Sequence, residues 1–537
     1  MSPTRWTAAG AALAAGLLAA AASLTVTTLA AAPASAQTAG TGTGYLHTDG
    51  NRIVDVTGAT VRLTGLNWFG METDNHTFHG LWANPPASWR GQVERMAELG
   101  FNTIRIPYTG DSLRPDAEAT SINSFTNPDL VGLHPLEILD RVIGHAGSLG
   151  MRVILDRHRP TASGQSALWY TPQASEQSMI DDWLLLAQRY AGNPTVVGAD
   201  LFNEPHAEGT LPNATGACWG CGDPARDWRL AAERIGNTIQ AVQPDWLIIV
   251  EGVSCPSGGL PNPSDGDPAT DDDCTWWGGN LLAAGAFPVR LDVPDRLVYS
   301  AHDYAISVFD RQPWFNDPSF PANLPGVWDH YWGYLHHQQV APVFVGEFGT
   351  TLQHPLDQQW LPALMSYLSG NQLSFTFWSW NPNSGDTGGI VLDDWWTVNQ
   401  PKYDILAPHL VPPTGGGGPT DPPTSPPPTT PPPAGDCQVS YAVTNSWPGN
   451  FQADVTVTNP GPGSLSGWEV SWTYAGNQAL FHWWGAQVEQ SGPQVSAGNV
   501  DYNGTVGAGQ SVTFGTQGTV TGANPVPSPI ACTATTG

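Results

Sequence analysis

Eight short apolar runs recur along roughly the first 400 positions of the chain, and each is long enough for one buried β-strand. Stretches with helical spacing of apolar residues lie between them. Segment 89–100 places Trp89, Val93 and Met96 on one helical face. A second segment, 228–242, does the same with Ala231, Ile235, Ile239 and Val242. The eight runs are 61–69, 102–108, 152–158, 195–203, 247–252, 296–304, 342–349 and 374–381.

This alternation of strand and helix predicts an α/β domain built on a parallel sheet. The number of strands and the length of the region favour a (β/α)8 TIM barrel over residues 44–411. A doubly wound open sheet is the alternative. We find no glycine-rich phosphate-binding fingerprint after the first run, which favours the barrel.

The pattern changes in the last hundred residues. Here apolar and polar positions alternate in short runs divided by Gly, Pro and Asn, as in an all-β sandwich. The clearest runs are 441–447, 451–459, 467–474 and 511–520. We therefore expect a small β-sandwich domain over residues 437–537.

Residues 412–436, between these two regions, are nearly all Pro, Thr and Gly. Such a composition cannot bury a core, so we expect an extended, solvated linker.

The N-terminus has the features of an export signal. Arg5 precedes a small, mostly apolar stretch at 8–32, and 34–36 reads Ala-Ser-Ala, a cleavage pattern. A membrane anchor is the alternative, but Ser and Thr interrupt the stretch, and no later segment is apolar for long enough to cross a bilayer. We expect residues 1–36 to be a signal peptide and the protein to be secreted, extracellular and soluble.

The charge balance narrows the range of partners. The formal net charge is −28, and Lys402 is the only lysine. An acidic surface repels nucleic acid and anionic lipid, so we expect neither nucleic acid nor membrane as a partner. The chain also has 24 tryptophans, whose flat rings suit ligands such as sugars, although about half of them are expected in the core.

The six cysteines predict three disulfides in an exported protein. Proximity along the chain suggests Cys218–Cys221, Cys255–Cys274 and Cys437–Cys532. A redox or zinc motif is the alternative for Cys218 and Cys221, but no second Cys/His pair has matching spacing.

Polar and aromatic side chains gather at the ends of the predicted strands. In a barrel of this kind the carboxyl ends of the strands share one face, which carries the chemistry. Glu204 by itself is a plausible strand exit before a proline, and an Arg–Glu ion pair that braces the barrel is also possible. Two carboxylates across one cleft, Glu204 and Glu347, are however what glycoside hydrolysis requires. The strand ends carry Arg105, His158, Asn203, Glu204, His302, Tyr304, Glu347, Trp378 and Trp380.

The motifs around these residues resemble glycoside hydrolase family 5, specifically its secreted bacterial endo-β-1,4-glucanases. They are NTIRIPY, ILDRHRP, LFNEPH, YSAHDY, VGEFGT and TFWSWNPNSGDTGG, in the family's order. The resemblance implies Glu204 as general acid/base and Glu347 as nucleophile. It further implies that Arg105 and Tyr304 position Glu347 and that Asn203 binds the sugar 2-hydroxyl. His158 and His302 would line the same subsite, with Trp378 as its stacking floor.

The implied mechanism is double displacement with retention, for which the carboxyl groups stand about 5 to 5.5 Å apart. It needs no metal and no cofactor.

Other tryptophans are candidates for binding more distant sugar rings. Trp276 and Trp277 follow the fifth strand and could stack on successive glucose units, or one could pack inward with only the other exposed. Trp82 is a weaker candidate of the same kind. The Asp-rich stretch 263–274 is better explained as a solvated loop than as a calcium site, because no spacing fixes the ligands.

The C-terminal region resembles a family 2 carbohydrate-binding module, of the type that adheres to crystalline cellulose. The resemblance implies a flat surface row of three aromatics, Trp447, Trp484 and Tyr502, and places Trp468 in the core.

Together these features predict a secreted, monomeric, retaining endo-β-1,4-glucanase that hydrolyses cellulose or a related β-glucan. The same mechanism on mannan, xyloglucan or another β-glucan is an alternative. A non-catalytic glycan-binding scaffold is disfavoured, since Glu204, Glu347 and Arg105 are all present.

Overall fold

The computed structural model describes residues 40–261 and 273–413 of the first region. Of the second region it describes 437–447, 449–461, 463–500, 503–521, 524, 526–527 and 530–536. The chain forms two compact units, and each is described by itself. The expected signal peptide and most of the expected linker, together with the acidic stretch up to residue 272, lie outside the described residues.

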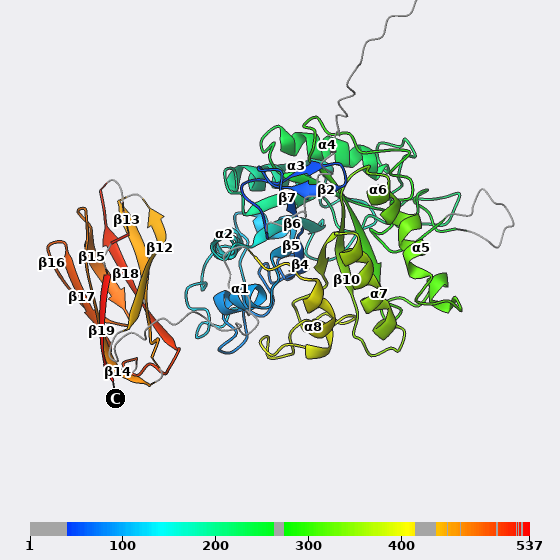
Figure 1. Cartoon of the computed structure of the whole chain (residues 1–537). Helices are drawn as coiled ribbons and strands as arrows, with labels where there is room; N and C mark the ends of the chain where they lie inside the picture. The colour runs from blue at the N-terminus through cyan, green and yellow to red at the C-terminus, as the bar shows by residue number, and fades with distance from the viewer. Residues whose placement is uncertain are drawn as a thin grey trace, which may run out of the picture. The chain divides into compact units, whose positions relative to one another are not determined.

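The first unit is a closed barrel of eight parallel strands (Figure 1). Each of the eight apolar runs overlaps one of these strands, so the predicted barrel is confirmed, and the open-sheet alternative is wrong. Around the barrel the strands follow the order of the chain and close between β10 and β4 through β11. They are β4 (Thr64–Asn67), β5 (Thr103–Thr109), β6 (Arg152–Arg159), β7 (Val196–Asp200), β8 (Leu247–Glu251), β9 (Leu297–Tyr304), β10 (Val343–Gly349) and β11 (Ser374–Phe377).

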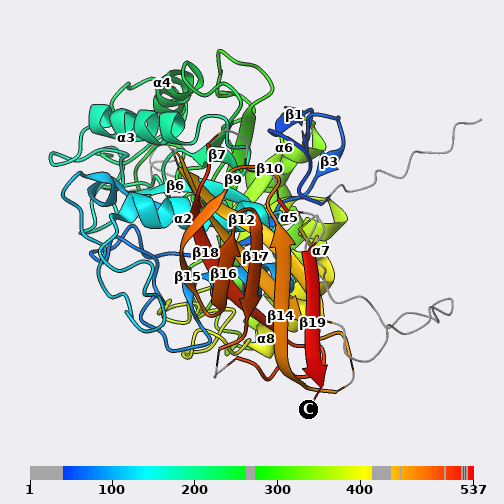
Figure 2. The ribbon, with the colours of Figure 1, turned by 90° about the vertical axis from the view of Figure 1, so that its left-hand side faces the viewer.

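Helices surround the barrel, and α3 and α4 lie side by side in both Figure 1 and Figure 2. In α1, Trp89, Val93 and Met96 are buried as predicted. The prediction that Val242 shares the apolar face of the helix with Ile235 and Ile239 is wrong. Helix α4 ends at Gln240, and Val242 lies beyond it with 38% of its surface exposed. The helices are α1 (Trp89–Glu98), α2 (Pro135–Ser148), α3 (Glu176–Arg189), α4 (Trp228–Gln240), α5 (Leu324–Trp328), α6 (Tyr334–His337), α7 (Asp357–Gly370) and α8 (Gln400–Leu406).

A small antiparallel sheet precedes the barrel, formed by β1 (His47–Asp49), β2 (Arg52–Val54) and β3 (Thr60–Val61). It lies beside α6, where the Asn51 amide donates to the His336 carbonyl at 3.0 Å (Figure 2). Ile53 and Val61 of this sheet form an apolar cluster with residues from five barrel strands, including Ile154 and Val298. The cluster fills the barrel near the amino-terminal parts of its strands, which leaves the carboxyl ends for polar side chains.

The second unit is a β-sandwich, as predicted. Two four-stranded antiparallel sheets pack around a core that includes Trp468, Trp472 and Phe514, so the expected core position of Trp468 is confirmed. One sheet has the order β12 (Gln438–Trp447), β13 (Asn450–Thr458), β18 (Ser511–Thr519), β15 (Ala479–Trp484). The other has the order β16 (Gln487–Ser491), β17 (Gln494–Gly498), β14 (Leu465–Thr473), β19 (Ile530–Thr536).

All three predicted disulfides are present: Cys218–Cys221, Cys255–Cys274 and Cys437–Cys532. No described helix is long and apolar enough to cross a membrane.

Candidate active site

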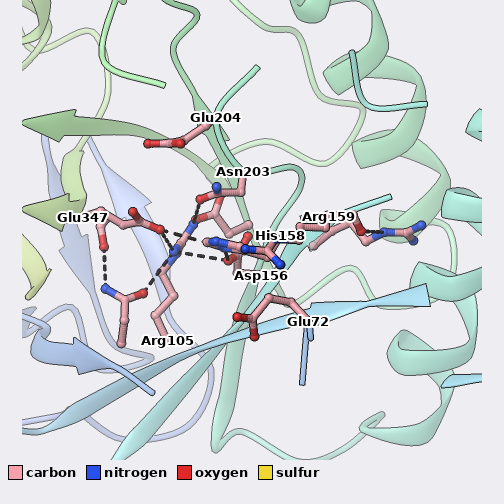
Figure 3. A network of polar contacts seen from close by, with 12 residues as sticks. Glu72, Arg105, Asp156, His158, Arg159, Asn203, Glu204 and Glu347 are labelled. Atoms are coloured by element: carbon pink, nitrogen blue, oxygen red, sulfur yellow. Dashed lines mark hydrogen bonds and ion pairs between the residues drawn. The ribbon is translucent and has the colours of Figure 1, made fainter. Parts of the chain in front are cut away.

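Arg105 stands at the centre of a polar network at the carboxyl ends of the strands (Figure 3). Its guanidinium is completely buried and forms ion pairs with four carboxylates from four different strands. The partners are Glu347 Oε1 at 2.7 Å, Asp200 Oδ2 at 2.8 Å, Glu251 Oε1 at 2.9 Å and Asp156 Oδ2 at 3.2 Å. Its nitrogens also donate to the side-chain oxygens of Asn67 and Asn203, both at 3.0 Å.

The charges in this network depend on one another. Burial lowers the pKa of Arg105, but the surrounding carboxylates outweigh it and hold the pKa well above its ordinary value. Burial raises the pKa of Asp156 and of Asp200 well above the usual range, in spite of Arg105. Burial acts in the same direction on Glu251, but His302 and Arg105 prevail, and the pKa of Glu251 lies below its ordinary value. Glu251 therefore stays charged more readily than Asp156 or Asp200.

Glu347, on β10, is held on both oxygens. Arg105 donates to Oε1 at 2.7 Å, and the Tyr304 hydroxyl donates to Oε2 at 2.7 Å. Burial, together with the charges of Glu347 and Glu204, raises the pKa of Tyr304 well above its ordinary value, so its hydroxyl stays a donor. A carboxylate held in this way is oriented, as a nucleophile requires.

Glu204 follows β7 and is partly exposed, with 19% of its side chain accessible. Its Oε1 lies 3.0 Å from His302 Nδ1, and its backbone N–H donates to Glu251 Oε2 at 2.7 Å. The same His302 nitrogen is 3.6 Å from Glu347 Oε2. One oxygen of Glu204 and one of Glu347 lie within 4.8 Å of each other. The two carboxylates predicted from the strand ends thus face the same small space.

His158 and Trp378 form the other wall of this space. Their rings stack in parallel, with centroids 5.3 Å apart, and Phe69 stacks on Trp378 at the same distance. His158 Nδ1 is 2.6 Å from Asp156 Oδ2, and burial lowers the pKa of His158 to about 4. A neutral imidazole is therefore stacked on a half-buried indole, with His158 Nδ1 3.9 Å from Glu347 Oε1.

Two known protein families match parts of this chain. Residues 54–384 match the family model described as cellulase, glycosyl hydrolase family 5. The chain belongs to glycosyl hydrolase family 5. Residues 437–536 match the model described as cellulose binding domain, so a family 2 module follows the hydrolase unit.

Individual relatives agree with this family 5 assignment. An endoglucanase from Paenibacillus polymyxa is 50% identical over 68% of this chain and 86% of its own length. The major extracellular endoglucanase of Xanthomonas campestris is 40% identical over 90% of this chain and 96% of its own length. Among solved structures, an endocellulase from Pyrococcus horikoshii in complex with cellotetraose matches with a TM-score of 0.62. It is 40% identical, and the match covers 70% of this chain and all of that one.

As a family 5 member the chain is a glycoside hydrolase, and the family works by double displacement. The structure brings Arg105, His158, Asn203, Glu204, His302, Tyr304, Glu347 and Trp378 together in one network. Trp380 does not belong to it, because its indole is fully buried and donates to Gln92 of α1, 2.9 Å away.

Trp276 and Trp277 have different environments. Trp276 is buried, with 6% of its surface exposed, and packs against Tyr304 and Phe309, so it supports the site from behind and offers no ring face to a sugar. Trp277 is 48% exposed and stacks on His206 with centroids 3.7 Å apart. The alternative of one inward and one exposed ring is therefore the arrangement in the structure. Trp82 is 38% exposed and contacts the rings of His79 and Trp395.

In the binding module, Trp484 is exposed, and its ring lies over Gly515 on the neighbouring strand, where a Cβ would overlap it. The side chain of Trp447 and the whole of Tyr502 lie outside the described residues. The three-residue row therefore stays a prediction.

The sequence reasoning missed several residues of the network: Asn67, Glu72, Asp156, Asp200 and Glu251. Glu72 lies beside His158, and burial raises its pKa (Figure 3). Asp156, Asp200 and Glu251 could have been found from one feature of the sequence: each is an acid inside an apolar strand, in VILDRH, VVGADLF and LIIVEG. Among the described residues, each group with metal-ligand spacing includes a carboxylate that is already paired with Arg105.

Proposed function

We propose that this chain cleaves internal β-1,4-glucosidic bonds of cellulose with Glu347 as nucleophile and Glu204 as general acid/base. One observation carries the assignment: a carboxylate oxygen of each residue lies within 4.8 Å of the other. Retaining enzymes hold their carboxyl groups about 5 to 5.5 Å apart, whereas inverting enzymes leave about 6.5 to 9.5 Å for a water. The short separation supports attack by Glu347 itself.

In the first step Glu347 attacks the anomeric carbon, while Glu204 gives its proton to the departing glucosyl oxygen. The glycosidic bond breaks, and an ester bond to Glu347 forms. Arg105 and Tyr304 aim the nucleophile, Asn203 binds the 2-hydroxyl, and Trp378 with His158 supports the sugar ring. In the second step Glu204 takes a proton from water, whose oxygen attacks the anomeric carbon; the bond to Glu347 breaks, and the sugar leaves with retained configuration.

Trp277 is the candidate for a subsite on the leaving-group side. It stacks on His206, and His206 Nδ1 is 2.7 Å from the backbone oxygen of Glu204, the proton donor. Trp82 is the candidate for a more distant sugar on the other side, beyond Trp378 and Phe69. Exposed rings at these places suit the apolar faces of glucose units.

Cellulose is the substrate that the family 2 module and the endoglucanase names of the relatives favour. In the proposed organisation a signal peptide (1–36) precedes the hydrolase (44–411), a linker (412–436) and the cellulose-binding module (437–537). The three disulfides and the extracellular relative support export. We further propose that the protein acts as a monomer.

The test uses a soluble cellulose derivative, on which the wild type should lower viscosity quickly and release reducing ends. Glu347→Gln should lose nearly all of this activity and still adsorb to cellulose. Product NMR at early times should show the β-anomer first. A fully active variant would overturn the nucleophile, an initial α-anomer would overturn retention, and faster hydrolysis of mannan or xyloglucan would change the polymer.

A further inference from the structure

Glu251 is a buried carboxylate that contacts both the main chain of Glu204 and His302, the histidine beside the Glu204 carboxyl group. It ends β8, and its side chain is completely buried. Oε2 accepts the backbone N–H of Glu204 at 2.7 Å, and Oε1 lies 3.3 Å from His302 Nε2. Oε1 also accepts from Arg105 at 2.9 Å. One carboxylate thus connects the main chain of Glu204, the histidine at its carboxyl group and the arginine at Glu347.

The main chain of Glu204 needs such a support. Its φ angle is 53°, in the left-handed region that residues with a Cβ rarely adopt. A residue persists there only when its surroundings hold it, and such residues concentrate at functional sites. The Glu251 carboxylate is the acceptor that holds the amide of Glu204 in this conformation.

His302 connects the same carboxylate to the other end of Glu204. Its ring lies between two acids, with Nε2 3.3 Å from Glu251 and Nδ1 3.0 Å from Glu204. Burial lowers the pKa of His302, but Glu251 and Glu347 outweigh it and raise the pKa well above its ordinary value. A protonated ring carries a proton on each nitrogen, so the ion pair of Nε2 with Glu251 favours the form of the ring in which Nδ1 donates to Glu204 Oε1.

The space around Glu251 leaves its carboxylate little freedom. Gly278, in the loop that covers it, would carry a Cβ 2.6 Å from Glu251 Oε2 and 3.4 Å from Glu204 Cγ. Gly278 also has a φ of +69°. Glycine at this position lets the loop backbone close over the contact between Glu251 and Glu204.

We propose that Glu251 is the positioning residue of the acid/base: it fixes the main chain of Glu204 and, through His302, the orientation of its carboxyl group. This inference rests on the proposed roles of Glu204 and Glu347. Proton donation to the leaving group, and proton removal from water in the second step, therefore both depend on Glu251.

Asp200 provides a matched control. It too is a buried carboxylate paired with Arg105, at 2.8 Å, and within the described part of the chain its hydrogen bond goes to that arginine. Glu251→Gln and Asp200→Asn each replace a buried carboxyl group beside Arg105 by an amide of the same shape. Only Glu251→Gln also disturbs the contacts with the Glu204 backbone N–H and with His302.

The experiment compares two aryl cellobiosides in the full-length protein. A dinitrophenyl group leaves without a proton, whereas a phenyl group needs the general acid, which typically contributes about 10²- to 10⁴-fold. Glu251→Gln should lower kcat/KM about 100-fold or more on the phenyl substrate and less than about tenfold on the dinitrophenyl one. Azide, which attacks the ester without a general base, should raise the kcat of this variant on the dinitrophenyl substrate. Asp200→Asn should lose a similar factor on both substrates.

Equal losses on the two substrates in Glu251→Gln, no loss, or no response to azide would overturn the inference. Glu204→Gln separates this from a failure of the proposed function: if it shows no dependence on the leaving group, the role of Glu204 is wrong. If Glu204→Gln shows the dependence and Glu251→Gln does not, only the inference fails. Should Glu251→Gln not fold, Gly278→Ala, which displaces the Glu251 carboxylate, must show the same selective loss, and equal losses there would overturn the proposal.

Discussion

Removing the hydroxyl of Tyr304 tests how Glu347 is held. The hydroxyl is buried and donates to Glu347 Oε2 at 2.7 Å, so Tyr304→Phe leaves one oxygen of a charged group without its donor. A hydrogen bond to a charged group contributes about 1.5 to 3 kcal/mol. If that stabilisation applies fully in the transition state, kcat/KM should fall about 10- to 150-fold, since about 1.4 kcal/mol is a factor of ten.

The assay is steady-state hydrolysis of a cellobioside, with the melting temperature as a check on folding. Tyr190→Phe is the matched control, because Tyr190 is also buried and donates to a carboxylate, Asp140, at 3.0 Å, but lies at the end of α3 outside the site. It should keep wild-type kcat/KM. Burial holds the pKa of Tyr304 well above 10, so any loss of wild-type activity on the alkaline side below pH 10 comes from another group. The same loss should therefore occur in Tyr304→Phe. A folded Tyr304→Phe variant with full kcat/KM would refute the reasoning.

Three further changes should have measurable effects. Trp484→Ala should weaken adsorption to crystalline cellulose about tenfold or more, because an aromatic ring no longer contacts the cellulose surface, and Gly515→Ala should act in the same direction by displacing that ring. Activity on a soluble substrate should not change. Full adsorption by both variants would contradict a role of Trp484 in cellulose binding. Replacing Cys437 and Cys532 by Ala should lower the free energy of unfolding of the second unit by about 4 to 5 kcal/mol, because the disulfide closes a loop of 95 residues and so reduces the conformational entropy of the unfolded chain. Denaturant unfolding measures this, and a loss below about 1 kcal/mol would contradict the entropic explanation. Burial lowers the pKa of His158 to about 4, against about 6.5 in the unfolded chain, so the unfolded chain binds the extra proton as the pH falls from 6.5 to 4, at a cost of up to about 3 kcal/mol from this residue. In urea unfolding a His158→Gln variant should therefore lose less stability over this window than the wild type, and equal losses would contradict this.

Much of the barrel could be predicted because strand and helix periods alternate clearly along the chain. The carboxyl ends of parallel strands meet at one face, so Glu204 and Glu347 could be paired although 143 positions separate them. Spacing alone also sufficed for the short-range disulfides.

The inner part of the site could not be predicted in the same way. Asp156, Asp200 and Glu251 are each a single acid in an apolar strand, and such an acid does not by itself reveal its partner. Only the closed barrel brings these acids to Arg105. Adjacent loop residues have no period that distinguishes inside from outside, which is why Trp276 and Trp277 could not be separated from sequence.

Trapping the covalent intermediate tests the central claim most directly. A 2-deoxy-2-fluoro cellobioside with a good leaving group should glycosylate a retaining enzyme and turn over slowly, because the fluorine disfavours the charged transition state of the second step. Mass spectrometry of the digested protein should find one fluorocellobiosyl label, on the peptide that contains Glu347. A label on Glu204 or on any other residue, or inactivation without a label, would contradict the account.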